Sequence, residues 1–408
     1  MNIYIAGISG TGMGPLALMA VDAGNVVCGS DLAKGAVTEE LIKNDIQVKL
    51  GVQDGTFLKM MNDDIGVDWF VYTSALPKDH PELLMAKKLG LKISKRDELI
   101  SYLVDSLDLK MIAVAGTHGK TTTAGMLIWT MQQLGIPVSY LVGTTLPFAP
   151  AGKYEKDAEY FVYEADEYDR NFLNFYPWLA AITVATFDHP DIYKTREEYK
   201  EAFLQFEQQS RHVVHGGEID NRISLAGEVR RIDATLAFKV LKQITNINED
   251  KMIEALNHFP GVGRRFEHID DGVYSDYAHH PEEIKATIQM AIEEAKRLKL
   301  RGVIALYEPH QNSRQHTIFE KYKDVFEGVD KLYWLPTFLV REDPDLKILE
   351  PQDFIANLTN KEKAESADMN DDLEQKLLEY HKDNYLILLM TAGPADLWLR
   401  SIFGGNAK

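Results

Sequence analysis

The chain has 408 residues, 45% of them hydrophobic and 26% charged, as in a soluble globular protein of more than one domain. Its formal net charge of −18 argues against binding to nucleic acid or to an anionic membrane surface, so an anionic substrate has to meet local positive groups. The one cysteine, Cys28, excludes an intrachain disulfide and fits a reducing cytoplasm, and we expect neither a signal peptide nor a transmembrane helix.

The N-terminal part alternates short apolar runs with amphipathic stretches, which is the pattern of a parallel α/β sheet. Strands are predicted at residues 2–6, 26–29, 69–72 and 91–94. A polar stretch at 105–110 marks a first boundary, so we place the first domain at residues 1–109.

A glycine-rich turn follows the first predicted strand and opens a helix, an arrangement that suits a diphosphate. A NAD-binding turn is one alternative, with Asp31 as the ribose partner, but Ser9 stands where that fingerprint has its second glycine. A purely structural turn is the other alternative. Parallel sheets bind ligands at the carboxyl ends of their strands. Contacts to a nucleotide diphosphate are therefore predicted at Gly10, Thr11, Gly12, Met13, Asp31, Ser74 and Ala75.

Residues 111–115 are predicted to be a buried strand, and residues 121–134 have helical spacing. The glycine turn between them places backbone N–H groups around an anion-sized space, where Lys120 would reach the outer phosphates and Thr121 would bind Mg²⁺. Val114 replaces the first glycine of a full P-loop, and a plain turn between core elements is the alternative. The predicted phosphate-binding residues are Gly116, Thr117, His118, Gly119, Lys120, Thr121 and Thr122.

Four acidic residues lie at or just after the end of the next predicted strand, 160–164. Acids at a strand end downstream of a P-loop suit an oxygen-liganded cation such as Mg²⁺, whereas a solvated acidic loop is the alternative. The strand predicted at 180–184 leads to a second possible ligand set around His189. Both strands would end at the same edge as the P-loop, so the predicted metal ligands are Thr121, Glu164 and His189.

A basic segment rich in turn formers, 259–266, marks the second boundary, which gives a central domain at 110–262 and a C-terminal domain at 263–408. In an acidic chain, Arg264 and Arg265 at this joint suggest a phosphate contact, with solvated linker charge as the alternative. Strands are predicted at 273–276, 302–307, 331–335 and 385–390, and a solvated helix and loop at 356–376.

Two strands of the C-terminal block end in turns that contain histidine. One histidine that faces a cleft can act as a base or as a substrate contact, whereas core or loop histidines are the alternative. The candidate residues in these turns are Asp276, Tyr277, His279, His310 and Arg314.

Six motifs in this order resemble those of the Mur ligase family: GTHGKTT at 116, EADEYD at 164, DHPD at 188, GRRFE at 263, DYAHHP at 276 and EPH-x-x-x-R at 308. The resemblance covers nearly the whole chain. It implies an α/β fold with three domains: a Rossmann-like UDP-binding domain, a P-loop ATPase domain and a Rossmann-like C-terminal domain. Members of this family are cytoplasmic, ATP-dependent amide ligases that build the peptidoglycan stem peptide.

The N-terminal turn looks most like that of family members that add L-alanine to UDP-N-acetylmuramate. Members that add a whole tripeptide, and a non-catalytic UDP-sugar-binding relative, are the alternatives. The resemblance implies ATP, Mg²⁺ and an acyl-phosphate route in which Lys120 and Arg265 neutralise phosphate charge, and it fits a monomer or homodimer. It also implies nucleotide contacts at Arg264 and Asp276, and contacts to the amino acid and the intermediate at Tyr277, His279, His310 and Arg314.

Three departures from the family pattern stand out. The central domain is short between Arg211 and Arg231. The family asparagine before the metal histidine is Val184, and the adenine-contacting His-Asn-x-x-Asn motif appears as residues 229–233 without its asparagines. The basic residue expected after His310 is Gln311.

Overall fold

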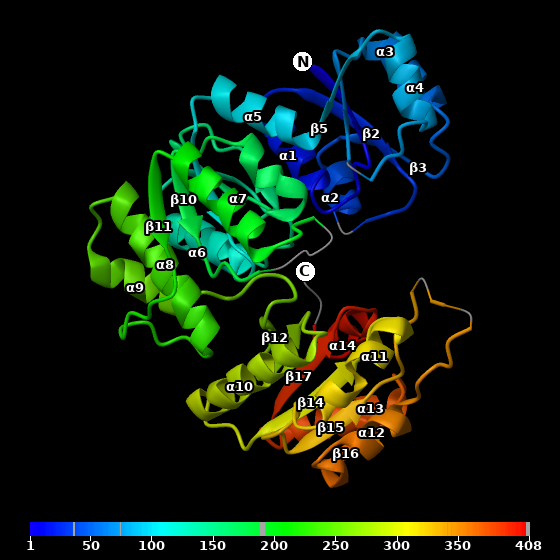
Figure 1. Ribbon diagram of the computed structural model, residues 1–408, viewed down its shortest axis with the longest axis vertical. Coiled ribbons are helices and arrows are strands. Elements are labelled where there is room, and N and C mark those ends of the chain that lie inside the picture. Colours follow the sequence, from blue (N-terminus) through cyan, green and yellow to red (C-terminus); the bar gives the residue numbers. More distant parts are fainter. Residues whose placement is uncertain (36, 74, 188–191, 341, 344, 405–408) are drawn as a thin grey trace. The chain divides into compact units, whose positions relative to one another are not determined.

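The structure, a computed structural model, describes residues 1–404 except 36, 74, 188–191, 341 and 344. It is an α/β fold with three sheets of five, six and six strands (Figure 1). One compact unit, Met1–Ile223 with Ile232–Phe259, holds two sheets, and the other, Ser224–Arg231 with Pro260–Lys408, holds the third. In the described part of the chain, no helix combines the length and apolarity that a membrane crossing requires.

The first sheet is parallel, in the order β3-β2-β1-β4-β5. Its strands are β1 (Asn2–Ala6), β2 (Val26–Asp31), β3 (Gln47–Leu50), β4 (Trp69–Tyr72) and β5 (Lys92–Lys95). Side chains of β1 alternate between two apolar clusters, so helices cover both faces. One face packs on α1 (Gly14–Asp22), α2 (Thr38–Lys43) and α5 (Arg96–Ser106), and the other on α3 (Thr56–Ile65) and α4 (Pro81–Lys88).

The second sheet has the order β11-β10-β6-β9-β7-β8, with only β8 antiparallel to its neighbour among the described strands. Its strands are β6 (Lys110–Ala115), β7 (Val138–Leu141), β8 (Gly152–Lys153), β9 (Tyr160–Glu164), β10 (Leu179–Ile182) and β11 (His212–His215). Side chains of β6 and β9 share one apolar cluster with α1 and α5, which explains why the first two sheets form one unit. Its helical elements are α6 (Lys120–Gln133), η1 (Tyr168–Asn174), α7 (Arg196–Gln209), α8 (Glu228–Ile244) and α9 (Glu249–Asn257).

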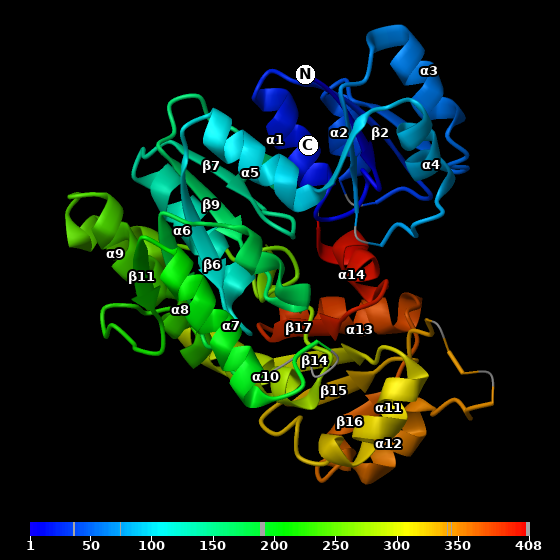
Figure 2. The same cartoon turned by 45° about the horizontal axis from the view of Figure 1, so that its top comes forward.

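The third sheet has the order β12-β13-β17-β14-β15-β16 and is parallel except for β12. Figure 2 labels four of its strands, β17, β14, β15 and β16. Its strands are β12 (Glu267–Asp270), β13 (Val273–Asp276), β14 (Val303–Glu308), β15 (Lys331–Trp334), β16 (Ala364–Ser366) and β17 (Leu386–Thr391). One face packs on α10 (Pro281–Arg297), α11 (Asn312–Ile318) and α12 (Pro351–Asn357), and the other on α13 (Asp371–Lys382) and α14 (Ala395–Phe403). Short helical turns lie at η2 (Phe319–Tyr322) and η3 (Lys361–Lys363).

Two predictions need correction. Residues 356–376, expected to be only helix and loop, contain β16, a short half-buried edge strand whose Glu365 pairs with Lys331 and Lys376. The polar sequence hides this strand, because it lacks an apolar alternation. The strand expected at 180–184 ends at Ile182, since the chain then turns to contact the loop before α6.

Candidate functional site

The loop between β6 and α6 contains two glycines in conformations that other residues rarely adopt. Gly116 and Gly119 have φ of 138° and 83°, and a Cβ on Gly116 would lie 2.0 Å from the Thr183 hydroxyl oxygen. The helix begins at Lys120, so the first N–H groups of α6, including those of Thr121 and Thr122, lack partners within the helix. The strand, the turn and the helix predicted here are all present.

The chain segment after β10 holds this loop in place. Thr117 donates its N–H to the Val184 carbonyl at 2.9 Å and its hydroxyl to the Thr186 carbonyl at 2.6 Å. The Thr183 hydroxyl donates to the His118 carbonyl at 2.6 Å, while the His118 side chain stays exposed. Val184 thus supports the loop through its backbone, although it cannot supply the amide of the family asparagine.

Lys120 is paired with a buried carboxylate that the sequence did not single out. Its Nζ donates to the Gly116 carbonyl at 2.7 Å and to Glu167 Oε2 at 2.7 Å. The Glu167 side chain has no exposed area, and burial raises the pKa of its carboxyl group although Lys120 opposes that rise. The Tyr193 hydroxyl donates to the Glu167 carbonyl at 2.7 Å. Glu167 therefore positions the loop lysine.

Two oxygen ligands of the predicted metal site lie side by side. The Thr121 hydroxyl donates to Glu164 Oε1 at 2.6 Å, and Glu164 Oε2 accepts from the Gly143 N–H at 3.3 Å. A hydroxyl and a carboxylate beside a phosphate loop fit Mg²⁺, which keeps its other positions for phosphate and water. His189 lies outside the described residues, among which there is no group of three or more His, Cys, Asp or Glu suited to a metal.

The glycine-rich turn of the first sheet is closed by Asp31. Its carboxylate accepts the Ser9 N–H at 2.9 Å, so this side chain is already engaged within the protein. Met13 is 4% exposed and packs in the core, which leaves only its backbone for a ligand. A Cβ on Gly7 would lie 2.8 Å from the Thr73 side chain, so the ends of β1 and β4 meet as predicted. Gly10, Thr11 and Ala75 are exposed, Gly12 is half-buried, and Ser74 lies outside the described residues.

In the second unit, the ring of Tyr277 lies close to both boundary arginines. The guanidinium carbons of Arg264 and Arg265 are 4.6 and 5.5 Å from its ring centroid. Arg264 donates through Nη2 to the Thr391 carbonyl at 2.7 Å, so it is anchored. Arg265 is exposed and remains accessible to an anionic ligand.

Asp276 is buried beneath this turn. Its carboxylate accepts the N–H groups of Phe266 and Ala278, each at 2.7 Å, and the Thr287 hydroxyl at 3.3 Å. Burial raises the pKa of this carboxyl group. The structure gives Asp276 a role in holding the turn, and its predicted contact with a nucleotide stays a prediction.

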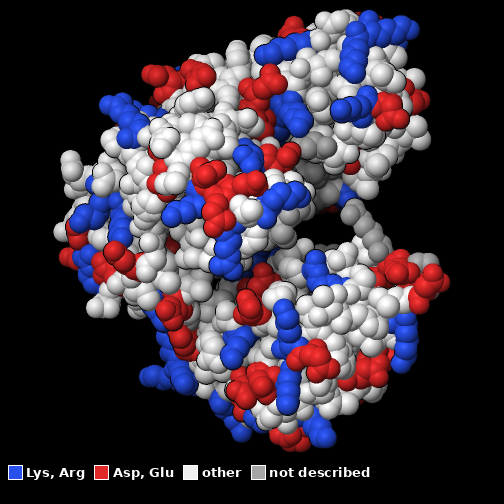
Figure 3. Space-filling view, viewed as in Figure 1, with Lys and Arg blue, Asp and Glu red and all other residues white. Residues whose placement is uncertain are grey.

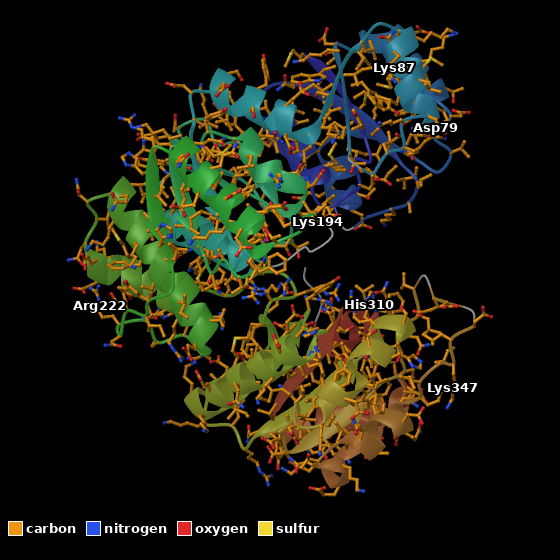
Figure 4. The ribbon with its side chains drawn as sticks, viewed as in Figure 1. Asp79, Lys87, Lys194, Arg222, His310 and Lys347 are labelled. Carbon is orange, nitrogen blue, oxygen red and sulfur yellow. The ribbon has the colours of Figure 1, made fainter. Side chains whose placement is uncertain are left out.

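His279 and His310, which follow β13 and β14, have ring centroids 6.3 Å apart. Figure 4 labels His310 among the side chains of the second unit. His279 Nδ1 lies 3.0 Å from the Tyr277 carbonyl oxygen, while His310 Nδ1 is buried without a hydrogen-bond partner in the described part of the chain. Burial lowers the pKa of both imidazoles, and the positive charge of Arg314 lowers both further. The structure therefore brings these three predicted residues together and favours the neutral form of both histidines.

The segment that replaces the adenine-contacting motif lies in the first turns of α8. Asp233 is 3% exposed, and its Oδ1 is 2.3 Å from where a Cβ on Gly119 would lie. This carboxylate is packed beneath the phosphate loop, and Val229 is 49% exposed. The segment offers no side-chain amide to a purine.

The comparisons with known proteins agree with this arrangement. Residues 2–106 match the model of the Mur ligase family catalytic domain, and residues 114–237 that of the Mur ligase middle domain. The chain is similar to UDP-N-acetylmuramate–L-alanine ligase of Lactobacillus delbrueckii subsp. bulgaricus, at 30% identity with 83% of this chain and 84% of that protein covered. The namesake from Clostridium tetani is 28% identical over 463 aligned positions, with 98% of each chain covered.

Two solved structures share the fold. UDP-N-acetylmuramate–alanine ligase from Thermotoga maritima has a TM-score of 0.75 at 22% identity, with 98% of each chain covered. A murein peptide ligase from Psychrobacter arcticus has a TM-score of 0.56 at 21% identity, with both chains fully covered. The domain matches, the relative at 30% identity and the shared fold lead to one conclusion: this chain belongs to the Mur ligase family.

Proposed function

We propose that the protein joins L-alanine to the carboxylate of UDP-N-acetylmuramate, with ATP as the energy source and an acyl phosphate as the intermediate. The observation that carries the proposal is the pairing of Thr121 with Glu164 directly beside Lys120 on the loop that opens α6. These groups suit phosphoryl transfer. The alanine-ligase relatives, which match most of the chain at 28–30% identity, favour this substrate pair.

In the first step, an oxygen of the substrate carboxylate attacks the γ-phosphorus of ATP and ADP leaves. Lys120, the N–H groups at the start of α6 and Arg265 would neutralise charge on the transferred group. Thr121 and Glu164, with His189, would hold Mg²⁺, which would neutralise phosphate charge when bound. Lys120 has to exchange part of its bonding to Glu167 and the Gly116 carbonyl for phosphate oxygens.

In the second step, the amine of the amino acid attacks the carbonyl carbon of the acyl phosphate. An amide bond forms, inorganic phosphate leaves and the amine loses a proton. A neutral His279 or His310 can accept that proton, and Arg314 can pair with the carboxylate of the amino acid.

The two histidines are expected to titrate below the ordinary histidine pKa of about 6.5. Burial and the nearby Arg314 disfavour their charged forms, so both rings stay neutral at pH 7 and gain a proton only at lower pH. Nuclear magnetic resonance titration of the ring protons, assigned with His279→Gln and His310→Gln, measures the midpoints. Midpoints above pH 7 for both rings would contradict their neutral state in the resting protein.

A weak preference for the base of the triphosphate is expected. Val184 and residues 229–233 lack the amides that could donate to and accept from a purine edge, whereas the phosphate-binding groups do not depend on them. Each lost hydrogen bond is worth about 0.5–1.5 kcal/mol, so GTP should support the reaction within about tenfold of ATP. Competition kinetics with the two nucleotides measures the ratio, and a thousandfold preference for ATP would reveal a substitute adenine pocket.

The proposed activity is tested by phosphate release from ATP with and without UDP-N-acetylmuramate and each of a panel of amine substrates. The panel contains L-alanine, glycine, L-serine and a tripeptide that begins with L-alanine. We expect release to require both the sugar nucleotide and L-alanine. Because a murein peptide ligase shares the fold, addition of a peptide is the second candidate activity. Phosphate release that only the tripeptide supports, among the amines of the panel, would favour it. If none of the amines in the panel supports phosphate release, both activities are excluded.

A further inference from the structure

Arg96 lies at the ligand-binding edge of the first sheet. It is the first residue of α5 and directly follows the last residue of β5. The sheet is parallel, so the carboxyl end of β5 is at the same edge as the glycine-rich turn after β1 and as Asp31 at the end of β2.

The guanidinium of Arg96 rests on the glycine-rich turn. A Cβ built on Gly12 would lie 2.6 Å from Arg96 Nη1, closer than real atoms approach. A side chain at position 12 would therefore displace the end of the Arg96 side chain. Its missing side chain lets a positive group lie directly against the backbone of the turn.

The contacts of Arg96 orient its guanidinium but do not use all of its N–H donors. Nη2 donates to the Tyr163 hydroxyl at 3.3 Å and Nε to Asp97 Oδ1 at 3.4 Å, while Asp97 Oδ2 accepts from Asn174 at 3.2 Å. Charge-assisted hydrogen bonds are usually about 2.7–2.9 Å long, so both contacts of Arg96 are long. Nη1 has no hydrogen bond to any residue that the structure describes. The side chain is 29% exposed, so a ligand can reach it.

Because the chain carries a large negative net charge, binding of an anionic nucleotide requires a local positive group. The net charge is −18, and Figure 3 shows acidic and basic side chains interspersed over the face that it displays. A planar guanidinium with free donors matches phosphate oxygens in geometry and charge. We propose that Arg96 binds the diphosphate of the nucleotide at the glycine-rich turn, and that Tyr163 and Asp97 hold its guanidinium in position. The assignment rests on the proposed function, because that function places a UDP-linked substrate in this part of the protein.

The matching experiment uses UDP as the probe and calorimetry as the readout, in the full chain and without turnover. Arg96→Ala should weaken UDP binding by about 10- to 100-fold, the usual scale for hydrogen bonds to a charged group. Binding of ADP with Mg²⁺ should stay within about twofold, because ADP binds at the α6 loop. Arg96→Lys, which keeps the charge but not the fork of donors, should fall between the wild type and Arg96→Ala.

Arg211→Ala is the matched control. Arg211 is an exposed arginine of the same unit and precedes β11, so it lies at the amino end of the second sheet, the end opposite the P-loop. This variant should bind UDP and ADP like the wild type. Unchanged UDP binding in Arg96→Ala would overturn the proposal, and so would a loss confined to ADP, which would assign Arg96 to the other nucleotide.

A double-mutant cycle with Gly12→Ala separates a direct role from damage to the fold. The added Cβ displaces the guanidinium, so Gly12→Ala should weaken UDP binding in the wild type and have little further effect in Arg96→Ala. Additive losses would overturn the proposal. If Arg96→Ala does not fold, Arg96→Lys and Arg96→Gln replace it, and equal UDP affinity in these two would contradict a role for the charge. Failure of the wild type to bind UDP would instead count against the proposed function.

Discussion

Replacing Lys120 by alanine should lower turnover by at least about 100-fold, because preorganised charge at a transferring phosphoryl group is worth at least that much. The Lys120 side chain is 14% exposed, and its ammonium group lies where the first turn of α6 meets the phosphate loop. The glycine-rich turn of the first sheet is a separate structural element, so UDP binding should stay close to that of the wild type. Steady-state phosphate release and calorimetry with UDP measure the two effects.

Lys110→Ala is the control for that experiment. Lys110 begins β6, at the opposite end of the same strand, and its 44% exposed side chain pairs with Glu159. Its removal should leave turnover unchanged, since surface ion pairs contribute little. A Lys120→Ala variant that retains a tenth of wild-type turnover would contradict the assignment of the phosphate loop.

Glu164→Ala should raise the Mg²⁺ concentration for half-maximal rate by at least about tenfold. Even the loss of a group that supports a metal ligand costs about 10- to 100-fold in metal affinity, and Glu164 is predicted to be a ligand itself. Its Oε1 already contacts the Thr121 hydroxyl, so its removal takes away one of two adjacent oxygens. His189→Ala should raise the requirement in the same direction. Metal titrations of phosphate release give the midpoints.

Asp169→Asn is the matched control in the same acidic cluster. Asp169 is exposed and has a φ of 52°, a conformation that asparagine also tolerates. Its metal titration should be that of the wild type. If the titration of Glu164→Ala is also unchanged, the cluster is a solvated loop and the metal lies elsewhere.

The sequence predicted the elements that carry the site because their signals are local. β9 and β13 have the predicted limits, since each is a short apolar run bounded by polar residues. The turn before α6 could be predicted because two glycines and a lysine stand between such a run and a helical pattern. β16 was not predicted, because a polar edge strand forms through its pairing with a neighbouring strand and has no apolar pattern of its own.

Contacts between distant residues account for what sequence reasoning missed. Glu167 contacts Lys120, which is 47 positions away in the sequence. The full burial of the Glu167 side chain could not be predicted, because the surrounding sequence is typical of a solvated acidic loop. Arg96 meets Tyr163 across 67 positions. A basic residue directly after a strand of a parallel sheet is the signal that could have identified Arg96.

Some predicted ligand residues have another role in the fold. Asp31 and Asp276 occupy the expected edges, but their carboxylates accept backbone N–H groups. Asp31 accepts that of Ser9, in the turn after β1, and Asp276 accepts those of Phe266 and Ala278. Met13 points into the core. A motif places a residue at an edge, whereas the direction of its side chain depends on packing that involves the rest of the unit.

The most direct test of the proposed reaction follows heavy oxygen from the substrate carboxylate of UDP-N-acetylmuramate. If an acyl phosphate forms, one carboxylate oxygen leaves with the phosphate when the amine attacks. Mass spectrometry should therefore find one heavy oxygen in the inorganic phosphate for each alanine amide formed, and the other in the product. Phosphate without heavy oxygen, or labelled phosphate released without an alanine amide, would contradict the proposed reaction.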